Sequence, residues 1–285
     1  MKKIYKILII ILFIITLSSC NNELEETTTI TTVYKDLDTI DINCKAANLY
    51  INKKDDLEDN TYSVTLTKSC DITYKDNILK IESNKTLFNI NILYNSKTNL
   101  NTLNFIALNG SCQANNVIIN NFLIDSKNCN YSRINALNIT NLKLIVGTFE
   151  HFKLNNSKID KSEISIEAAK FGTFIKKNSI NELVFKQYTN YTEIEDNKLN
   201  NAKIITEKAN INFHKNSYAD ATLETNVGTI FSSISWSGGY TIDISSPKKE
   251  IYPEYFTIQD NKYIYGDGSS HLNVKSNFKA CLWFY

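Results

Sequence analysis

Apolar and polar residues alternate along most of this chain, and from residue 178 to residue 234 the alternation repeats with a period of 19 residues. Three consecutive blocks begin at Asn178, Asn197 and Asn216. Within each block, apolar residues lie two positions apart with polar residues between them, which predicts short strands with one buried face. A fixed period of this length is typical of a solenoid, in which each repeat forms one turn.

Equivalent positions of the three blocks carry side chains of the same kind. The third position holds Ile180, Leu199 and Tyr218, the sixth Leu183, Ala202 and Ala221, the eighth Phe185, Ile204 and Leu223, and the fifteenth Thr192, Ile211 and Ile230. No block can bury these side chains alone, whereas stacked blocks form one continuous core whose parallel strands pair between turns. A composition rich in Asn, Ile and Lys could create repeats by chance, but three blocks in phase favour a true repeat.

The same pattern extends upstream with less regular spacing. Residues 117–124, 134–146 and 157–171 each fit one turn, with Phe171 among the apolar residues of the last. The sequence therefore predicts an all-β fold, a parallel β-helix or solenoid with turns of about 19–22 residues.

The two ends of the repeat have patterns of their own. Residues 34–83 alternate like the middle, and we expect them to form a β-rich N-terminal cap, because a terminal solenoid turn must block edge pairing. Beyond residue 234, a Gly238-Gly239 turn precedes a loop bracketed by Pro247 and Pro253. The aromatic finish at 281–285 is expected to close the open end of the core. Residues 34–285 thus form one predicted domain.

The first twenty residues have the pattern of a targeting segment. Three lysines within residues 2–6 precede an apolar run at 7–17, which is too short for a transmembrane helix of about 20 residues. The run ends in Leu17-Ser18-Ser19-Cys20, which resembles the lipobox of bacterial lipoproteins. That resemblance implies a signal peptide over residues 1–20, with lipid such as diacylglycerol and palmitate on Cys20. An ordinary signal peptide or an uncleaved anchor is the alternative.

The segment after the cysteine, residues 21–33, is acidic and rich in threonine, and we interpret it as a tether. The chain of 285 residues has 42% hydrophobic residues, 16 Tyr and 14 Phe, which suits a packed β-rich core. Its 8 Gly and 2 Pro exclude a collagen-like or linker-like protein. A net charge of +1 and a single arginine, Arg133, argue against a nucleic-acid partner.

Candidate catalytic chemistry is sparse. His151, His214 and His271 lack the spacing of a metal site, and the chain contains neither a Cys-x-x-Cys nor a Gly-x-Ser-x-Gly motif. We therefore assign no catalytic residue, no metal ligand and no cofactor. Five cysteines follow Cys20, an odd number that cannot pair completely within one chain. Two of them, Cys112 and Cys129, are either close enough to bridge or are small apolar fillers, and we favour fillers.

One candidate ligand-contact face emerges from the repeat. Glu182, Asn201 and Asp220 occupy the same block position, so a solenoid would stack them as a polar ladder that could bind a cation or a glycan. A ladder of this kind is more often a solvated face. Tyr188 and Tyr191 could line an adjacent face near Tyr218 and stack on sugar rings, or they are half-buried strand residues.

Three further segments carry a family resemblance. Residues 40–83 run from a short repeat into a longer charged hairpin, residues 223–233 read LETNVGTIFSS, and residues 265–276 read YGDGSSHLNVKS. Together they look like the bacterial putative-adhesin family of β-helical surface domains, over most of the chain after the tether. The resemblance implies a cell-surface location and a binding or scaffolding role, and it transfers no catalytic residue.

These observations predict a protein anchored to the cell membrane by lipid on Cys20, on the extracytoplasmic side. The expected role is adhesin-like binding or scaffolding without catalysis, and the partner is a glycan or a protein surface. A polysaccharide-acting enzyme on a β-helix is the alternative, and a structural spacer without a ligand is a third possibility. Function is expected where regularity fails, either in the insertions before Asn178 or in the excursion between Pro247 and Pro253.

Overall fold

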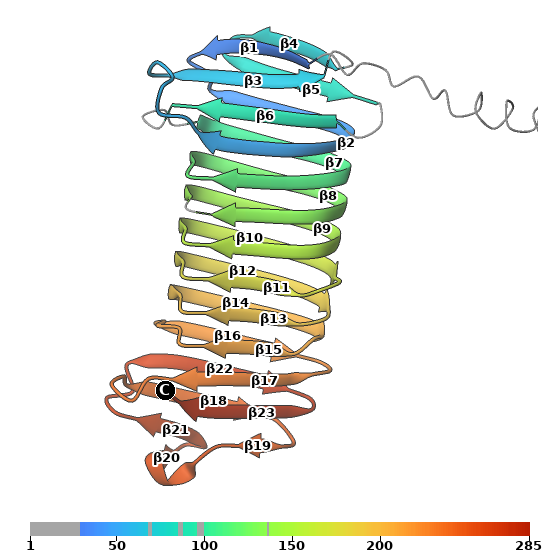
Figure 1. Ribbon diagram of the computed structural model, residues 1–285. Coiled ribbons are helices and arrows are strands. Elements are labelled where there is room, and N and C mark those ends of the chain that lie inside the picture. The colour runs from blue at the N-terminus through green and yellow to red at the C-terminus, as the bar shows by residue number, and fades with distance from the viewer. Residues whose placement is uncertain (1–28, 68–69, 85–87, 96–99, 136) are drawn as a thin grey trace, which may run out of the picture.

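The computed structural model of the chain describes residues 29–67, 70–84, 88–95, 100–135 and 137–285. The predicted signal peptide, Cys20 and most of the predicted tether lie outside these described residues. In the described part, the chain is nearly all β and its strands join into one sheet that is not closed, which confirms the all-β class (Figure 1). No helix of that part is long and apolar enough to cross a membrane.

The strands fall into an N-terminal group, a middle group and a C-terminal group. The N-terminal strands are β1 (Thr29–Lys35), β2 (Thr39–Lys53), β3 (Thr61–Thr67), β4 (Asp71–Lys75), β5 (Ile78–Ser83) and β6 (Phe88–Tyr94). The middle strands are β7 (Leu100–Asn115), β8 (Ile118–Asn135), β9 (Asn138–Asn155), β10 (Lys158–Ala169), β11 (Thr173–Lys176), β12 (Ser179–Thr189), β13 (Thr192–Glu195), β14 (Lys198–Lys208), β15 (Ile211–His214), β16 (Asp220–Thr225) and β17 (Thr229–Ile234). The C-terminal elements are β18 (Tyr240–Ser245), β19 (Lys249–Glu250), the 3-10 turn η1 (Pro253–Tyr255), β20 (Thr257–Gln259), β21 (Lys262–Tyr265), β22 (Ser270–Ser276) and β23 (Lys279–Phe284).

Two parallel ladders run through the middle group. Strands β7, β8 and β9 are long and pair in order, and their partners downstream split into two shorter strands. One ladder then continues through β10, β12, β14 and β16, and the other through β11, β13, β15 and β17. Partner residues such as Ile180 and Leu199 occupy the same position of successive blocks. The nineteen-residue period of the sequence is therefore the register of the parallel pairing.

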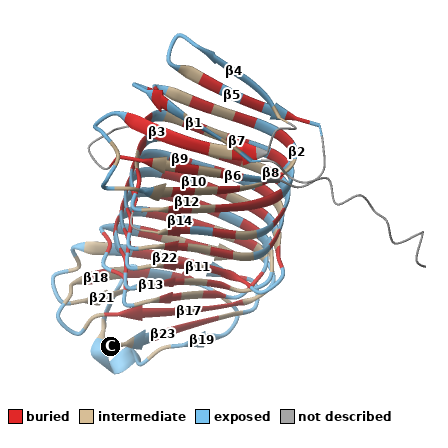
Figure 2. Ribbon diagram, turned by 45° about the horizontal axis from the view of Figure 1, so that its top comes forward, coloured by how far each residue is buried: buried red, intermediate tan, exposed pale blue. Residues whose placement is uncertain are grey.

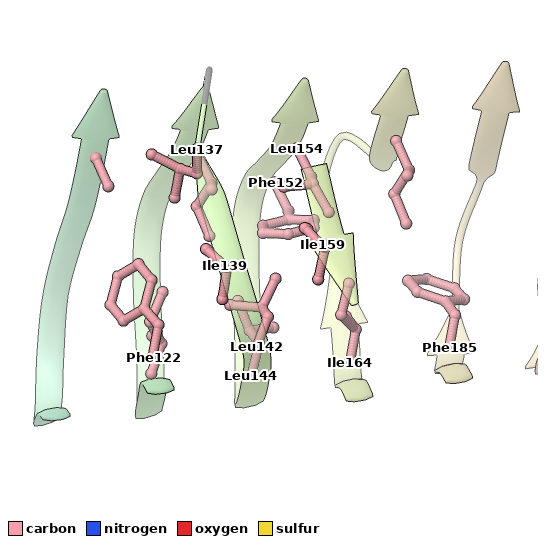
Figure 3. Packing of buried hydrophobic residues seen from close by; sticks show 14 of the residues in the cluster. Phe122, Leu137, Ile139, Leu142, Leu144, Phe152, Leu154, Ile159, Ile164 and Phe185 are labelled. Carbon is pink, nitrogen blue, oxygen red and sulfur yellow. The ribbon is translucent and has the colours of Figure 1, made fainter. Parts of the chain in front are cut away.

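The apolar positions of the blocks face inward and stack in rows. One row passes from strand to strand through Ile81, Ile42, Phe105, Ile124, Leu144, Ile164, Phe185, Ile204, Leu223, Val274 and Ile244. Every member is at most 4% exposed, and Figure 3 shows Leu144, Ile164 and Phe185 contributed by successive strands. Burial of each such side chain contributes about 1.5–3 kcal/mol to the free energy of folding. The burial depends on the adjacent strands, because each side chain is covered by its equivalents above and below.

A second row inside the stack is polar. Asn178, Asn197 and Asn216 are nearly fully buried. Asn197 Oδ1 accepts hydrogen bonds from the backbone N–H and from the Nδ2 of Asn178, both at 2.9 Å, and Asn216 Oδ1 accepts the same pair from Asn197. The Nδ2 atoms also donate to carbonyls one coil away, so the amides are satisfied along the row. The residue before each asparagine has a positive φ, 57° at Lys177 and Asp196 and 52° at Lys215, which turns the chain sharply there.

At the N-terminal end the strands do not stack in chain order. Strand β2 pairs in parallel with β5 and β6 on one side and with β7 on the other. Antiparallel partners cover the outer strands: β4 pairs with β5, β3 with β6, and β1 with β3 (Figure 1). The first long strand of the chain is therefore enclosed by strands that come later.

The C-terminal end repeats this device. Strands β22 and β23 pair with β16 and β17 on one side, and with β18 and β19 on the other. An antiparallel hairpin of β20 and β21 covers β18 from outside. The expectation that the aromatic finish closes the open end holds for Phe284, which packs against the core, but not for Trp283, which points outward and is 48% exposed.

Burial follows the predicted alternation along the middle strands, as the red and pale-blue bands of Figure 2 show. Phe171 departs from the prediction, since it is 52% exposed. It lies in the turn between β10 and β11, beside Gly172, whose φ of 99° reverses the chain. Its ring stacks on His151 at a centroid distance of 4.6 Å, on the outside of the turn.

Candidate functional site

The predicted polar ladder exists as a geometric row. Glu182, Asn201 and Asp220 pair in register on β12, β14 and β16, and the row continues to Lys161 on one side and His271 on the other. All three predicted members face outward and are exposed. Lys161 Nζ lies 3.9 Å from Glu182 Oε2, and both side chains are about half exposed, so this ion pair is weak.

A shallow groove of about 420 Å³ runs beside this row. Its lining comes from the residues just before the ladder positions: Asn138, Ile139, Thr140, Lys158, Ile159, Asp160, Ser179, Ile180, Asn181, Lys198, Leu199 and Asn200. The amides already bond to one another, since Asn200 donates to Asn181 at 3.1 Å and Asn181 donates to Asp160 at 3.0 Å. Glu182 and Asn201 lie outside the groove, and three of its polar side chains are already bonded to one another.

Asp220 belongs to a different hollow. Strands β16, β18, β21 and β22 form a notch of about 270 Å³ in which Asp220, His271 and Thr241 are register neighbours. Asp243 and Lys262 complete its polar wall. Within the described residues, no group of three or more His, Cys, Asp or Glu side chains is placed to hold a metal ion. The structure thus separates Asp220 from the groove beside Glu182 and Asn201.

The three tyrosines predicted near one another have different environments. Tyr188 is about half exposed, with Lys208 Nζ 5.6 Å from its ring centroid. Tyr191 is partly buried and donates its hydroxyl hydrogen to Glu193 at 2.9 Å, and burial raises its pKa to about 12. Tyr218 is 6% exposed and packs inside the core against Phe213, as its inward block position predicts, so it does not extend the face of Tyr188 and Tyr191.

A charged cluster lies on strand β13 and its neighbour β11. Glu193 and Glu195 point to the same side of the strand, and Lys176 of β11 donates to both carboxylates, at 2.9 Å to Glu195. The hydrogen bond from Lys176 lowers the pKa of Glu195. Burial lowers the pKa of the neighbouring His214. The two acids are thus bridged by a lysine on an open strand surface.

The cysteines behave as fillers. Cys112 and Cys129 are buried free thiols, in agreement with the favoured interpretation. Burial raises the pKa of Cys129 to about 12 and raises that of Cys112 as well. Neither thiol is therefore poised for nucleophilic chemistry at neutral pH.

The C-terminal end of the stack carries a cluster of aromatic rings, the distal aromatic cluster. Its members are Trp236, Tyr252, Tyr255, Phe256, Tyr263, Tyr265 and Phe284, linked by ring contacts of 4.1–6.4 Å. Trp236, Tyr252 and Tyr255 are each about half exposed. The predicted excursion between Pro247 and Pro253 contains only Tyr252 of these rings. The others lie outside it and come together only when η1, β21 and β23 fold against one another.

No family model matches this chain, and no curated protein matches it. Among solved structures, it is similar to a putative adhesin from Parabacteroides merdae (14% identity, TM-score 0.43, covering 90% of this chain and 95% of that one). It is also similar to a putative adhesin from Bacteroides fragilis (13% identity, TM-score 0.37, 90% and 97% covered). A third is a putative lipid binding protein from Parabacteroides distasonis (13% identity, TM-score 0.34, 90% and 96% covered).

The resemblance drawn from the sequence recurs in the names of two of these structures. At such identities and TM-scores the names describe those proteins alone. What the present chain does has to be argued from its own surface.

Proposed function

We propose that this protein is a lipid-anchored, extracytoplasmic β-solenoid that presents a binding surface away from the membrane and performs no catalysis. The stacked coils form a stalk whose faces are hydrogen-bonded ladders. Cys20 precedes β1, which lies at one end of the stack, and the distal aromatic cluster lies at the other end (Figure 1).

The observation that carries this proposal is the exposure of the distal aromatic cluster. A monomeric soluble protein rarely exposes large apolar groups together unless they meet a partner. Here Trp236, Tyr252, Tyr255 and the nearby Ile258 are 48–62% exposed and gather at one end of the stack. Tyr and Trp are also the side chains that most often anchor a partner.

The alternative, a polysaccharide-acting enzyme, finds less support in the geometry. Glycoside hydrolysis needs two carboxyl groups that flank the scissile bond in an open cleft. The closest pair on one strand, Glu193 and Glu195, is engaged by Lys176. Asp220 and Asp243 share the C-terminal notch, but its volume of about 270 Å³ suits a small group rather than a sugar chain.

Lipid attachment is tested by metabolic labelling with an alkyne analogue of palmitate in a bacterial host. We expect the natural chain to carry the label and Cys20→Ser to lose it. Cys70→Ser is the matched control and keeps the label, because it removes a thiol of the folded domain. Label that persists in Cys20→Ser would contradict the anchor.

Binding is tested with liposomes that carry the full-length chain, applied to glycan and protein arrays. We expect retention on a restricted set of spots, relative to liposomes without the chain. Equal retention of both liposomes on every spot would overturn the binding role and favour a structural spacer.

A further inference from the structure

We propose that the outer face of Trp236 is a stacking site for an uncharged sugar ring. This inference rests on the proposed binding role and names its ligand class and its central residue. Three features support it: the arrangement of the rings around Trp236, the groups beside it and the contacts that hold it in place.

One face of the Trp236 indole is covered and the other is open. Phe284 stacks on it with a centroid distance of 4.1 Å and an interplanar angle of 19°. Tyr255 lies 5.2 Å from Trp236 and 5.6 Å from Phe284, nearly perpendicular to both. Because it is almost equidistant from two stacked rings, Tyr255 stands beside the pair and not above the indole.

Tyr265 lies beside the pair on the side of Phe284, at 6.4 Å from Trp236 and 4.9 Å from Phe284. The three rings that contact the indole therefore occupy one face and the edges. Trp236 remains 51% exposed, so its free area is the face opposite Phe284. This open indole face is a flat floor for a ligand, and Tyr255 stands at its edge.

Hydrogen bonds and ring contacts hold Trp236 in one position. The backbone N–H of Trp236 donates to Tyr285 O at 3.3 Å, and its carbonyl accepts from the Tyr265 hydroxyl at 2.8 Å. Perpendicular ring contacts on the edges restrict both torsions of the side chain. A ligand that stacks there orders little that is not already ordered, which favours binding.

The chemistry around the floor selects an uncharged, hydroxylated ligand. The face of an aromatic ring carries negative partial charge, and the C–H groups on one side of a pyranose carry positive partial charge. The residues beside Trp236 in the chain are Ser235 and Ser237, whose hydroxyls are exposed and lie 2.9 Å apart. The contacting rings Phe284, Tyr255 and Tyr265 are uncharged. The hydroxyls of a sugar would therefore find serine hydroxyls beside the indole as hydrogen-bond partners.

The chain offers a direct spectroscopic test, because it contains only two tryptophans. Trp283→Phe leaves Trp236 as the sole indole in the full-length protein. We titrate this variant with methyl pyranosides of glucose, galactose, mannose and N-acetylglucosamine. The expected result is a saturable shift of indole emission to shorter wavelength with at least one of them. No shift with any of the four overturns the proposal, as does a shift with tetramethylammonium alone.

Matched variants locate the site on a neutral glycan array. Trp236→Ala is expected to lower affinity at least tenfold, about 1.4 kcal/mol. Trp283→Ala is expected to stay within twofold, although Trp283 is 48% exposed, because its ring contact is with Phe231 of another face. Trp236→Phe keeps a flat ring on Phe284 and retains most binding, which separates loss of the platform from loss of folding.

The outcomes also distinguish this inference from the binding role itself. Glycan binding that survives Trp236→Ala, or selective binding to proteins alone, overturns the sugar site and leaves the binding role standing. Absence of selective binding on both arrays overturns both.

Discussion

The middle of this molecule and its two ends are built by different rules. In the middle, each coil pairs with the coil before and the coil after it in the chain, as β12 does with β10 and β14. At each end, one coil is enclosed by strands distant in sequence: β2 between β5–β6 and β7, and β22–β23 between β16–β17 and β18–β19.

This difference distinguishes the addition of further coils to the stack from the covering of its two ends. In-order stacking buries apolar rows with short connections, so it can extend by nearest-neighbour contacts. An enclosed coil needs a longer loop to close before it pairs, which costs entropy. In return, both of its edges are covered, and antiparallel strands protect the outermost coils from pairing with other chains.

The surfaces differ in the same way. Outward polar residues of the middle bond to their equivalents in the next coil, as Asn200 does to Asn181 and Asn181 to Asp160. At the C-terminal end, Trp236 and Tyr255 keep free area. In the middle, repetition therefore supplies hydrogen-bond partners for outward polar side chains. Aromatic side chains that are free to contact a partner gather where the repetition stops.

The largest expected effect breaks the enclosed C-terminal coil. Val274→Asp places a charge in the buried row between Leu223 and Ile244. An unpaired buried charge costs on the order of 3–5 kcal/mol. By hydrogen exchange, we expect protection to fall in β18 and β16 together with β22. Lys275→Asp, at the exposed next position, is the control and should change little. Loss confined to β22 would contradict the enclosed arrangement.

A smaller effect is expected from the buried amide row of the middle. Asn197→Ala removes the acceptor of two hydrogen bonds from Asn178 and the donor to Ile175 O. Each buried polar group left without a partner costs about 1–3 kcal/mol, so we expect a loss of about 2–3 kcal/mol in urea unfolding. The control, Asn200→Ala, removes an exposed amide contact and should cost below about 0.5 kcal/mol. Equal losses in both variants would mean that burial of the row is unimportant.

The middle could be predicted from the sequence because its information is local. Two-residue alternation identifies the inward side chains, and the phase of three blocks gives the register that pairs Phe185 with Ile204 and Ile204 with Leu223. Stacking of Glu182, Asn201 and Asp220 followed from the same register. The burial of the asparagines at the block starts did not follow from it, because Asn is common in exposed turns and these side chains are buried through partners one coil away.

The ends could not be predicted in this way. The sequence around β22 and β23 has the same alternation whether it lies outside the stack or between two coils, because alternation reports burial and not the identity of the neighbour. Phe171 fits the inward period, but Gly172 turns the chain before the ring reaches the core. The distal aromatic cluster likewise combines residues 236, 255, 265 and 284, which only the three-dimensional fold brings together.

The smallest expected effect is on the pH dependence of the unfolding free energy, and it compares an ion pair of the middle with one of the C-terminal end. The pKa of Glu195 is held low by the hydrogen bond from Lys176, and both side chains are about 30% exposed. A carboxyl whose folded pKa lies below its unfolded value of about 4.3 adds stability above that pH. This stability is lost as pH falls through the folded pKa, and solvent screening keeps it below about 1 kcal/mol.

Lys176→Met should therefore reduce the loss of unfolding free energy between about pH 6 and pH 3.5, measured in urea at each pH. The matched variant at the C-terminal end is Lys279→Met. Lys279 lowers the pKa of Glu250, whose side chain is 58% exposed against 30% for Glu195, so solvent screens this carboxylate more and its variant should follow the natural chain more closely. An acid response altered more by Lys279→Met than by Lys176→Met would mean that the end, and not the middle, holds the better-shielded ion pair.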